Sequence, residues 1–281
     1  MSGKSRVGQR GKKLNNMEEP IDERVTKGIV PNVNCNFFSG EGWHRETVAA
    51  PCEMPLTIFV NGQETVTLLC TPAMLTQLVI GFLYLEGIID NTHEVASIRV
   101  CEDEPIADVR LAKAEFTLPP RRTLASGCGS SVNFKPQGKR VDSNLVVKPK
   151  EVLSLMKQLY QRQDLFQRSG GIHSSALCNR KQILVMAEDI GRHNTLDKIM
   201  GECLMRKLPT QDSILLTTGR ISSEMLLKAV RMKVPIVVSR SSPTELAISL
   251  GNELGVTIIG YSRGSRLSVF SAEERLLSAG N

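Results

Sequence analysis

The sequence predicts an α/β protein, α+β overall, in which a smaller β-rich N-terminal domain precedes an α/β domain. Residues 56–69 read as two alternating strands around an Asn-Gly pair, the strongest short signal for a β-hairpin. From residue 183 onward, apolar runs of about five residues alternate with helical patterns. Short apolar strands between helices are typical of a mainly parallel sheet covered on both faces, so we expect that sheet in the C-terminal half.

A basic tail, residues 1–30, precedes the first domain. Its first 13 residues hold five Lys or Arg side chains and no acidic one, so the net charge of +6 leaves only +1 for the rest of the chain. A segment of Gly, Ser, Lys and Arg cannot bury a core, and we expect it to be disordered. An RNA or membrane-surface role is the weaker alternative to a solubilising extension, and we predict no nucleic-acid partner.

The chain carries no signal for a membrane or an export route. Its longest apolar run, Leu78–Leu85, is far shorter than the roughly 20 residues that span a bilayer. The basic tail lacks the apolar segment of a signal peptide. Seven cysteines, an odd number without a Cys-x-x-Cys pair, indicate neither a disulfide framework nor a zinc ribbon. We therefore predict a cytoplasmic protein with no membrane partner and mostly buried thiols.

The N-terminal domain is expected at residues 31–145. Thr71 and Pro72 read as the N-cap and first position of a helix over Ala73–Glu86, which Gly87 ends. The expected strands are Leu56–Val60, Glu64–Leu69, Ser97–Cys101 and Ala107–Leu118.

The C-terminal domain is expected at residues 146–281, after a polar linker at 136–149. A helix over Glu151–Gln161 opens it, and Ser242–Glu245 form a capping box for the last helix, with Gly255 at its C-terminal cap. The expected strands are Ile183–Ala187, Ser213–Thr217, Pro235–Ser239 and Val256–Gly260, and the helices between and before them cover 194–206, 223–232 and 243–254.

An arginine follows each of the four expected strands of this domain. The segments are 188–194, 218–223, 240–242 and 261–266. Ligands of such sheets bind at the carboxyl ends of the strands, and arginine side chains with helix N-terminal amides bind anions. One arginine in one loop would be ordinary surface composition. Four in succession favour a phosphorylated ligand.

Cys128 lies in the segment Ala125–Ser131, between glycines that indicate an exposed, flexible loop. Arg121 and Arg122 upstream would lower the pKa of its thiol and favour the nucleophilic thiolate. A chance loop cysteine is an equally good interpretation of the residues alone. Core packing is expected instead for three other cysteines, which fall in predicted strands or a helix. They are Cys70, Cys178 and Cys203.

His193 and Asp197 are four residues apart, so on a helix they share a face and the carboxylate can orient the imidazole. The alternative is a surface pair near a helix start. His173, after two glycines, could join the same site. The sequence has no zinc-deaminase signature, no P-loop and no Gly-x-Gly-x-x-Gly fingerprint.

Seven short segments between about Pro51 and Phe270 form one ordered set. They are Val60-Asn-Gly62, Thr71-Pro72, Gly81-Phe-Leu-Tyr-Leu-Glu-Gly87, Gly170-Gly-Ile-His173, Glu188-Asp-Ile-Gly-Arg-His-Asn-Thr-Leu-Asp-Lys198, Thr218-Gly-Arg220 and Ser242-Pro-Thr244. Together they resemble the FdhD family of formate dehydrogenase accessory sulfurtransferases, and as a set they are specific. The basic tail lies outside the resemblance.

The resemblance implies a fold and a reaction. The C-terminal domain is expected to be a cytidine-deaminase-like three-layer α/β/α domain without the deaminase zinc, so no metal is expected. A cysteine desulfurase is expected to load sulfur on a loop cysteine, here Cys128, as a persulfide. The protein would then pass this sulfur to the molybdenum cofactor of formate dehydrogenase, in its bis-guanine-dinucleotide form.

The resemblance also implies ligand residues and partners. The cofactor-binding segment of the family lies near the C-terminus, which here implies Tyr261, Ser262, Arg263, Gly264, Ser265 and Arg266. We add Arg192, His193 and Arg220 as further contacts. The implied partners are the desulfurase, the catalytic subunit of formate dehydrogenase and a second copy of the chain in a homodimer.

The sequence departs from the family at one point. Many members carry Cys-Gly-x-Cys-Gly in the loop, whereas here Ser131 stands at the second cysteine position. This argues against release of sulfur by an intramolecular disulfide, and leaves direct transfer from the Cys128 persulfide as the hypothesis. Two alternatives stay open, a non-catalytic chaperone that binds the cofactor and a hydrolase that uses His193 with Asp197.

Overall fold

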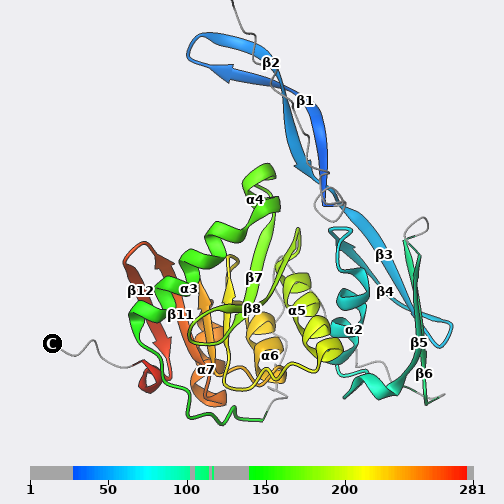
Figure 1. Cartoon of the computed structure of the whole chain (residues 1–281), viewed down its shortest axis with the longest axis vertical. Coiled ribbons are helices and arrows are strands. Elements are labelled where there is room, and N and C mark those ends of the chain that lie inside the picture. Colours follow the sequence, from blue (N-terminus) through cyan, green and yellow to red (C-terminus); the bar gives the residue numbers. More distant parts are fainter. Residues whose placement is uncertain (1–27, 102–104, 114–115, 117–138, 277–281) are drawn as a thin grey trace, which may run out of the picture.

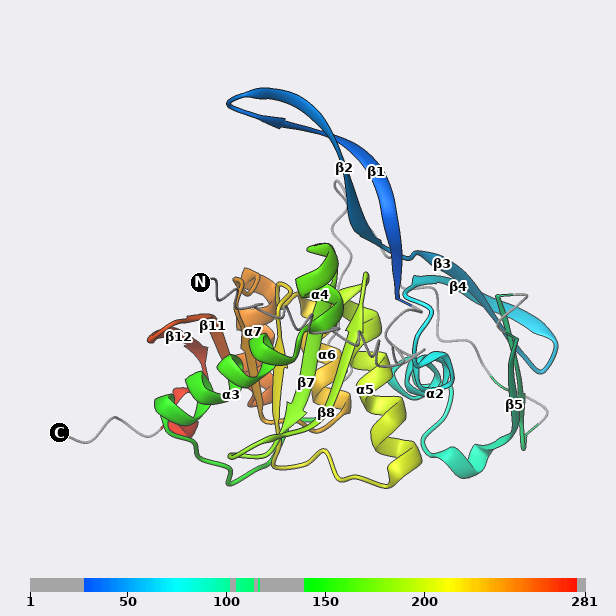
Figure 2. The same ribbon diagram turned by 45° about the horizontal axis from the view of Figure 1, so that its top comes forward.

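The computed structural model describes residues 28–101, 105–113, 116 and 139–276. These residues form a six-stranded sheet between helices, a four-stranded sheet beside it, and a two-stranded ribbon that stands away from both (Figures 1 and 2). The predicted α/β class, α+β overall, is confirmed. The domain boundary at residues 145/146 remains a prediction.

The ribbon, which we call the arm, is absent from the sequence prediction. β1 (Ile29–Ser39) and β2 (Gly42–Pro51) pair in antiparallel fashion over their whole length. β1 begins two residues inside the predicted tail of residues 1–30. Because most side chains of the arm are exposed on both faces, its sequence lacks the alternation that reveals a half-buried strand.

The four-stranded sheet has the order β4-β3-β6-β5. The predicted hairpin is confirmed, since Asn61 and Gly62 both have positive φ, as a two-residue turn between β3 and β4 requires. β6 ends at Leu111, and Ala112 and Lys113 bend away, so the predicted strand to Leu118 was too long. The strands are β3 (Met54–Val60), β4 (Gln63–Cys70), β5 (Val95–Cys101) and β6 (Ile106–Leu111).

Helix α2 (Leu75–Leu85) packs on this sheet and begins later than predicted. Its N-cap is Met74, in the left-handed region with φ 55°, and no side chain caps it. Thr71 was expected in that role. It is fully buried, and its amide and hydroxyl bind Asp189 and the Ile190 amide, so they are not free to cap the helix. The short helix η1 (Thr92–Glu94) leads into β5.

The six-stranded sheet has the order β12-β11-β10-β9-β7-β8, and the prediction of a mainly parallel sheet was wrong. Only β9 with β10 and β10 with β11 pair in parallel, because β7 with β8 and β11 with β12 are hairpins joined by short turns. The strands are β7 (His173–Cys178), β8 (Ile183–Asp189), β9 (Ile214–Thr217), β10 (Ile236–Ser239), β11 (Thr257–Arg263) and β12 (Arg266–Ser271).

Helices cover both faces of this sheet and give three layers (Figure 1). Helix α3 packs on one face, and α5, α6 and α7 pack on the other. The three layers are compatible with the cytidine-deaminase-like fold, which stays a prediction. The helices are α3 (Pro149–Arg162), α4 (Asp164–Ser169), α5 (Arg192–Arg206), α6 (Ser223–Arg231), α7 (Glu245–Leu254) and the short η2 (Glu273–Arg275).

Of the two caps predicted for α7, the C-terminal cap is confirmed and the N-terminal cap is wrong. Gly255 caps its C-terminus with φ 67°, as expected. Its N-cap is Thr244, whose hydroxyl accepts from the Ala247 amide, and the predicted capping box that starts at Ser242 is wrong. The Ser242 carbonyl accepts from the Ile221 amide instead, which draws residues 242–243 into a bridge with the loop before α6.

The two sheets are joined through a close contact between α2 and α5. A Cβ atom on Gly81 would lie 1.7 Å from the Asp197 carbonyl oxygen, and one on Gly201 would lie 1.9 Å from the Gln77 carbonyl oxygen. Side chains cannot fit between backbones at such distances. The two glycines therefore set how closely the N-terminal sheet and its helix approach the C-terminal sheet.

We predict that Gly81→Ala destabilises the protein by roughly 3 kcal/mol or more, because the added methyl group meets backbone that cannot move aside. Urea unfolding followed by circular dichroism measures this loss. Gly40→Ala is the matched control, since a Cβ there meets nothing within 4 Å. Equal stability of the two variants would show that α2 and α5 are not held at this separation.

Candidate functional site

The carboxyl ends of β8, β9, β10 and β11 meet at one edge of the six-stranded sheet. β7 runs antiparallel to both β8 and β9, so β8 points the same way as the parallel set β9–β11. The prediction that the four arginine-bearing segments share one edge is therefore confirmed, although the sheet is mixed. We call this edge, with Arg192, Arg220, Arg240 and Arg263, the arginine edge.

Contacts link the first two segments of the arginine edge. A Cβ on Gly219 would lie 3.0 Å from Arg192 Cβ and 3.5 Å from His173 Nδ1. His173 Nδ1 lies 3.4 Å from Thr218 Oγ1, and β7 begins at His173 beside the end of β8. His173, predicted only as a possible member of the site, thus stands between two of its segments.

The other two segments are linked in the same way. Arg263 Nε donates to the Arg240 carbonyl at 2.8 Å, and the Tyr261 amide donates to the Ser241 carbonyl at 3.1 Å. Ser239 Oγ donates to the Gly219 carbonyl at 2.6 Å and joins these segments to the preceding one. The four segments therefore form one connected surface, from the start of α5 to the end of β11.

The predicted ligand segment 261–266 is a β-hairpin turn and not a loop before a helix. Arg263 and Arg266 are paired across β11 and β12, with Gly264 (φ 57°) and Ser265 in the turn. Tyr261 and both arginines are exposed. The hairpin places Arg263 and Arg266 opposite each other in the β11–β12 register, at the end of the arginine edge nearest β12.

Two buried donors at this edge have no protein partner among the described residues. They are Nε of Arg192 and the hydroxyl of Ser262, whose residue is only 1% exposed. Buried donors without partners are costly, so a ligand with oxygen acceptors would be stabilised here. This observation supports the predicted anion site. Arg220 is exposed after Gly219 and adds positive charge without a described protein partner of its own.

The predicted pairing of His193 with Asp197 is wrong. Asp197 is buried and accepts from Lys228 Nζ at 2.5 Å, while His193 Nε2 lies 3.2 Å from Glu224 Oε2. Both of these new partners, Lys228 and Glu224, lie on α6, which packs beside α5. Burial raises the pKa of Asp197, and the Lys228 ammonium opposes that rise. With the pair separated, the structure does not support a hydrolase that uses His193 with Asp197.

The His193 ring lies beside the Glu224 carboxylate at the start of α6. The His193 ring holds the pKa of Glu224 below its usual value, and Lys228 and Arg192 add to this effect while partial burial opposes it. The contact joins His193 Nε2 and Glu224 Oε2 at 3.2 Å. Glu224 therefore reduces the positive charge of the arginine edge beside Arg192.

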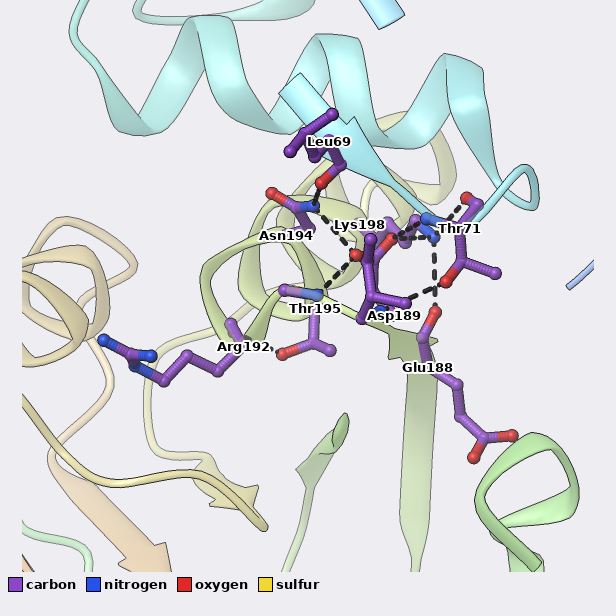
Figure 3. A network of polar contacts seen from close by, with 10 residues as sticks. Leu69, Thr71, Glu188, Asp189, Arg192, Asn194, Thr195 and Lys198 are labelled. Carbon is purple, nitrogen blue, oxygen red and sulfur yellow. Dashed lines mark hydrogen bonds and ion pairs between the residues drawn. The ribbon is translucent and has the colours of Figure 1, made fainter. Parts of the chain in front are cut away.

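A buried charge network fixes the backbone behind the arginine edge (Figure 3). Lys198 Nζ lies 2.6 Å from Asp189 Oδ2, and both side chains are fully buried. Asp189 also accepts from the amides of Thr71 and Gly191 and from the Asn194 side chain at 2.8–3.0 Å. In Figure 3 the Arg192 side chain points away from this network. The network therefore holds the start of α5 while Arg192 reaches outward.

The network also ties the two sheets together, which sequence reasoning missed. Lys198 Nζ donates to the carbonyls of Thr71 and Glu188 at 3.1 and 3.2 Å. Asn194 Nδ2 donates to the Leu69 carbonyl at 2.8 Å, at the end of β4. The only signal in the sequence was that Asp189, Asn194 and Lys198 fall in one segment of the motif set.

Core packing is confirmed for three of the six described cysteines, whereas Cys35, Cys52 and Cys101 are only partly buried, so the expectation of mostly buried thiols was too broad. Cys70, Cys178 and Cys203 are buried, and burial raises the pKa of each thiol to about 12. Cys128 lies outside the described residues. Among the described residues no group of His, Cys, Asp and Glu side chains could hold a metal ion. Nor does any helix in this part of the chain have the length and apolar character to cross a membrane.

The comparisons with known proteins agree with the motif set. The family model described as the FdhD/NarQ family matches residues 51–277. The chain belongs to the FdhD/NarQ family. The resemblance stated from the motifs is thereby confirmed. The match begins at Pro51, the last residue of β2, so the arm lies almost entirely outside it.

Relatives and a solved structure extend the match. The chain is 41% identical over 245 residues to the sulfur carrier protein FdhD of Halalkalibacterium halodurans, which covers 84% of this chain and 90% of the relative. It is 41% identical over 233 residues to the protein of the same name from Bacillus subtilis, with 80% and 88% covered.

A crystal structure described as a formate dehydrogenase accessory protein of Desulfotalea psychrophila is 25% identical, with a TM-score of 0.75. The match covers 89% of this chain and 100% of that chain. The described fold is therefore the fold of this group of proteins.

We predict that Asp189→Asn costs about 3–5 kcal/mol of stability, because it leaves the buried Lys198 ammonium with carbonyl partners only. Lys198→Met should cost less, since Asp189 keeps three donors. Urea unfolding tests both. Asp108→Asn, in an exposed pair with Arg110, is the control and should change stability by less than about 1 kcal/mol. A loss for Asp189→Asn no larger than that of the control would contradict the role of the network.

We predict that the arginine edge binds sulfate more tightly as the pH falls from about 7.5 to about 5.5. Burial lowers the pKa of His173 from its ordinary value of 6.5. The charge of Arg192 and the His193 ring lower it further, whereas the Asp189 carboxylate opposes the fall. The ring is therefore neutral at pH 7, and a bound dianion raises its pKa, so binding takes up a proton. Sulfate keeps its charge over this range.

Calorimetric titration of the folded protein measures the effect, and the affinity should rise by up to about tenfold. His173→Asn should flatten the profile, whereas His44→Asn on the arm should leave it unchanged. A wild-type affinity that does not vary with pH would remove His173 from the site.

Proposed function

We propose that this protein carries sulfur from a cysteine desulfurase to the molybdenum cofactor that formate dehydrogenase needs. Membership of the FdhD/NarQ family, with relatives named sulfur carrier protein FdhD at 41% identity, supports this function most directly. The similarity to a formate dehydrogenase accessory protein supports the same setting. We further propose that the protein acts in the cytoplasm, as a homodimer, with the desulfurase and the catalytic subunit of formate dehydrogenase as partners.

We propose that Cys128 holds the sulfur as a persulfide. The Cys128 thiolate would attack the outer sulfur of the desulfurase persulfide, form a new sulfur–sulfur bond and release the desulfurase thiolate. Cys70, Cys178 and Cys203 are poor candidates for this role, because thiols with a pKa of about 12 are protonated at neutral pH and are weak nucleophiles. With Ser131 at the second cysteine position, delivery would proceed directly from Cys128.

The acceptor we propose is the bis-guanine-dinucleotide form of the cofactor. Its diphosphate groups are the kind of ligand that paired arginines and unpartnered donors bind. Arg263 and Arg266 on the hairpin would contact one end, with Ser262 beneath them and Tyr261, Gly264 and Ser265 beside them. Arg192 and Arg220 would contact the other end of the ligand, and His193 would tune the charge through Glu224.

A non-catalytic chaperone that binds the same cofactor is the second candidate. One observation favours it, the single cysteine in a segment where many family members carry two. The arginine edge would serve such a chaperone equally well. The two functions differ only in whether Cys128 accepts sulfur.

We predict a sulfur adduct on the intact protein after incubation with a cysteine desulfurase, L-cysteine and pyridoxal phosphate. Mass spectrometry should show the adduct on the wild type and on Cys101→Ala, a control at a half-buried cysteine, and not on Cys128→Ala. If the wild type gains no sulfur while the desulfurase itself is loaded, the carrier function is wrong and the chaperone is favoured.

A further inference from the structure

A groove with a volume of about 580 Å³ lies between the start of α2, β8 and the start of α4. Its apolar lining includes Pro72, Met74, Leu165 and Met186, and Val100 of β5 adds to its wall. No arginine of the arginine edge is among its described lining residues. Apolar clefts of this volume are typical of binding sites, so the groove calls for an occupant that the anion site does not supply.

The chain enters the described structure at the edge of this groove. Gly28 is buried, and a Cβ atom on it would lie 2.7 Å from Leu165 Cδ1 and 2.9 Å from Thr71 Cγ2. Leu165 lines the groove, and Thr71 directly precedes the lining residue Pro72. The Gly28 carbonyl accepts from the Cys52 amide at 3.0 Å, which fixes the entry point. Figures 1 and 2 show α4 and the start of α2 on either side of the base of the arm.

The residues that precede Gly28, which we call the docking segment (residues 14–27), differ from the basic start of the tail. Their apolar side chains recur at spacings of three, four and four residues. They are Leu14, Met17, Ile21 and Val25. This spacing is typical of one face of an amphipathic helix. Pro20 suits the first turn of a helix, and Lys27 suits its last turn.

A helix over residues 20–27 needs a surface to pack against, because so short a helix is marginal in water by itself. The groove is within reach without a linker. At 1.5 Å per residue, Val25 lies roughly 5 Å and Ile21 roughly 10 Å from Gly28 along the helix axis. The apolar face of the docking segment therefore starts where the apolar groove starts.

The charges of the docking segment and the groove are complementary. Residues 17–25 hold four acidic side chains and one basic side chain. They are Glu18, Glu19, Asp22 and Glu23, against Arg24. On the groove side, α2 begins with no acidic residue in its first turn and no side-chain cap at Met74, and Arg162 lines the wall. The acids of the groove have partners already, since Glu188 accepts from two amides at the start of α4 and Asp164 pairs with Arg168.

We propose that the docking segment folds back onto its own chain and that Ile21 and Val25 occupy the groove, with the acidic side chains toward Arg162 and the start of α2. The occupant is tethered at Gly28, so its effective concentration is high and a small apolar contact suffices. The docked segment closes the groove to other ligands and holds the base of the arm against α4. This inference stands on the groove and the docking segment and does not rest on the sulfur-carrier function.

Hydrogen–deuterium exchange of the full-length protein, followed by mass spectrometry, tests this contact. The amides of residues 21–27 should exchange about tenfold or more slowly than in the isolated peptide of residues 14–27. Because the contact is intramolecular, the protection should not vary with protein concentration. Exchange as fast as in the peptide overturns the proposal and leaves the groove to a different partner. Protection that grows with protein concentration also overturns it, because the occupant would then be a second copy.

Variants on each side of the contact provide the second test. Ile21→Asp/Val25→Asp and the groove variant Met74→Asp should each bring the exchange of residues 21–27 to the rate of the peptide. Aspartate tolerates the left-handed backbone of residue 74, with φ 55°, and suits the N-cap position, so α2 should still form. Val7→Asp, in the basic start of the tail, is the matched control and should exchange like the wild type. Matching circular dichroism melts would show that the variants fold.

The peptide of residues 14–27, labelled with a fluorophore, provides the third test. It should bind to the Ile21→Asp/Val25→Asp variant, whose groove is open, and about tenfold or more weakly to the wild type, whose groove is filled. Equal binding to both proteins overturns the proposal, and so does no binding to the variant at about 1 mM peptide. Protection of residues 21–27 that survives Met74→Asp places the docking segment elsewhere and overturns it as well.

Discussion

The buried ion pair between Asp189 and Lys198 is the interaction on which the rest of this structure depends. Two fully buried charges are tolerated only when every remaining hydrogen-bonding position is occupied. Here those positions are filled from both sheets, by Thr71 after β4 and by the end of β8 with the first turn of α5. The two charges therefore have all their partners only when the two sheets are assembled. We infer that the backbone of the arginine edge takes its final form when the sheets assemble.

This coupling explains how a mixed sheet could support the proposed anion site. The direction of β8 relative to β9–β11, and not the share of parallel pairings, decides where the loops meet. Behind the loops, the Gly81 and Gly201 contacts leave α5 no freedom to slide. In front, Arg192 Nε and the Ser262 hydroxyl remain without protein partners. A rigid support with unsatisfied donors at its surface is the arrangement expected of a preformed ligand site.

Thiol chemistry and ligand binding are kept apart in the described residues. The thiols of Cys70, Cys178 and Cys203 are buried, with a pKa near 12, so they pack as small apolar side chains. The arginine edge carries its four arginines and Glu224, with the rings of His173 and His193 beside them. In the proposed function a separate residue, Cys128, brings sulfur to a ligand at the arginine edge, which keeps the two tasks on different residues.

The sequence by itself determined the local elements and the residue types of the site. The Asn61-Gly62 hairpin, the alternation of apolar runs with helices, and the arginines after four strands follow from periodicity and turn chemistry, which act within a few residues. Tertiary structure alone decided the partners. Thr71 binds Asp189 instead of capping α2, and Lys228 and Glu224 separate Asp197 from His193, because residues distant in sequence competed for the same groups. The arm lacked a signal because strands exposed on both faces do not alternate.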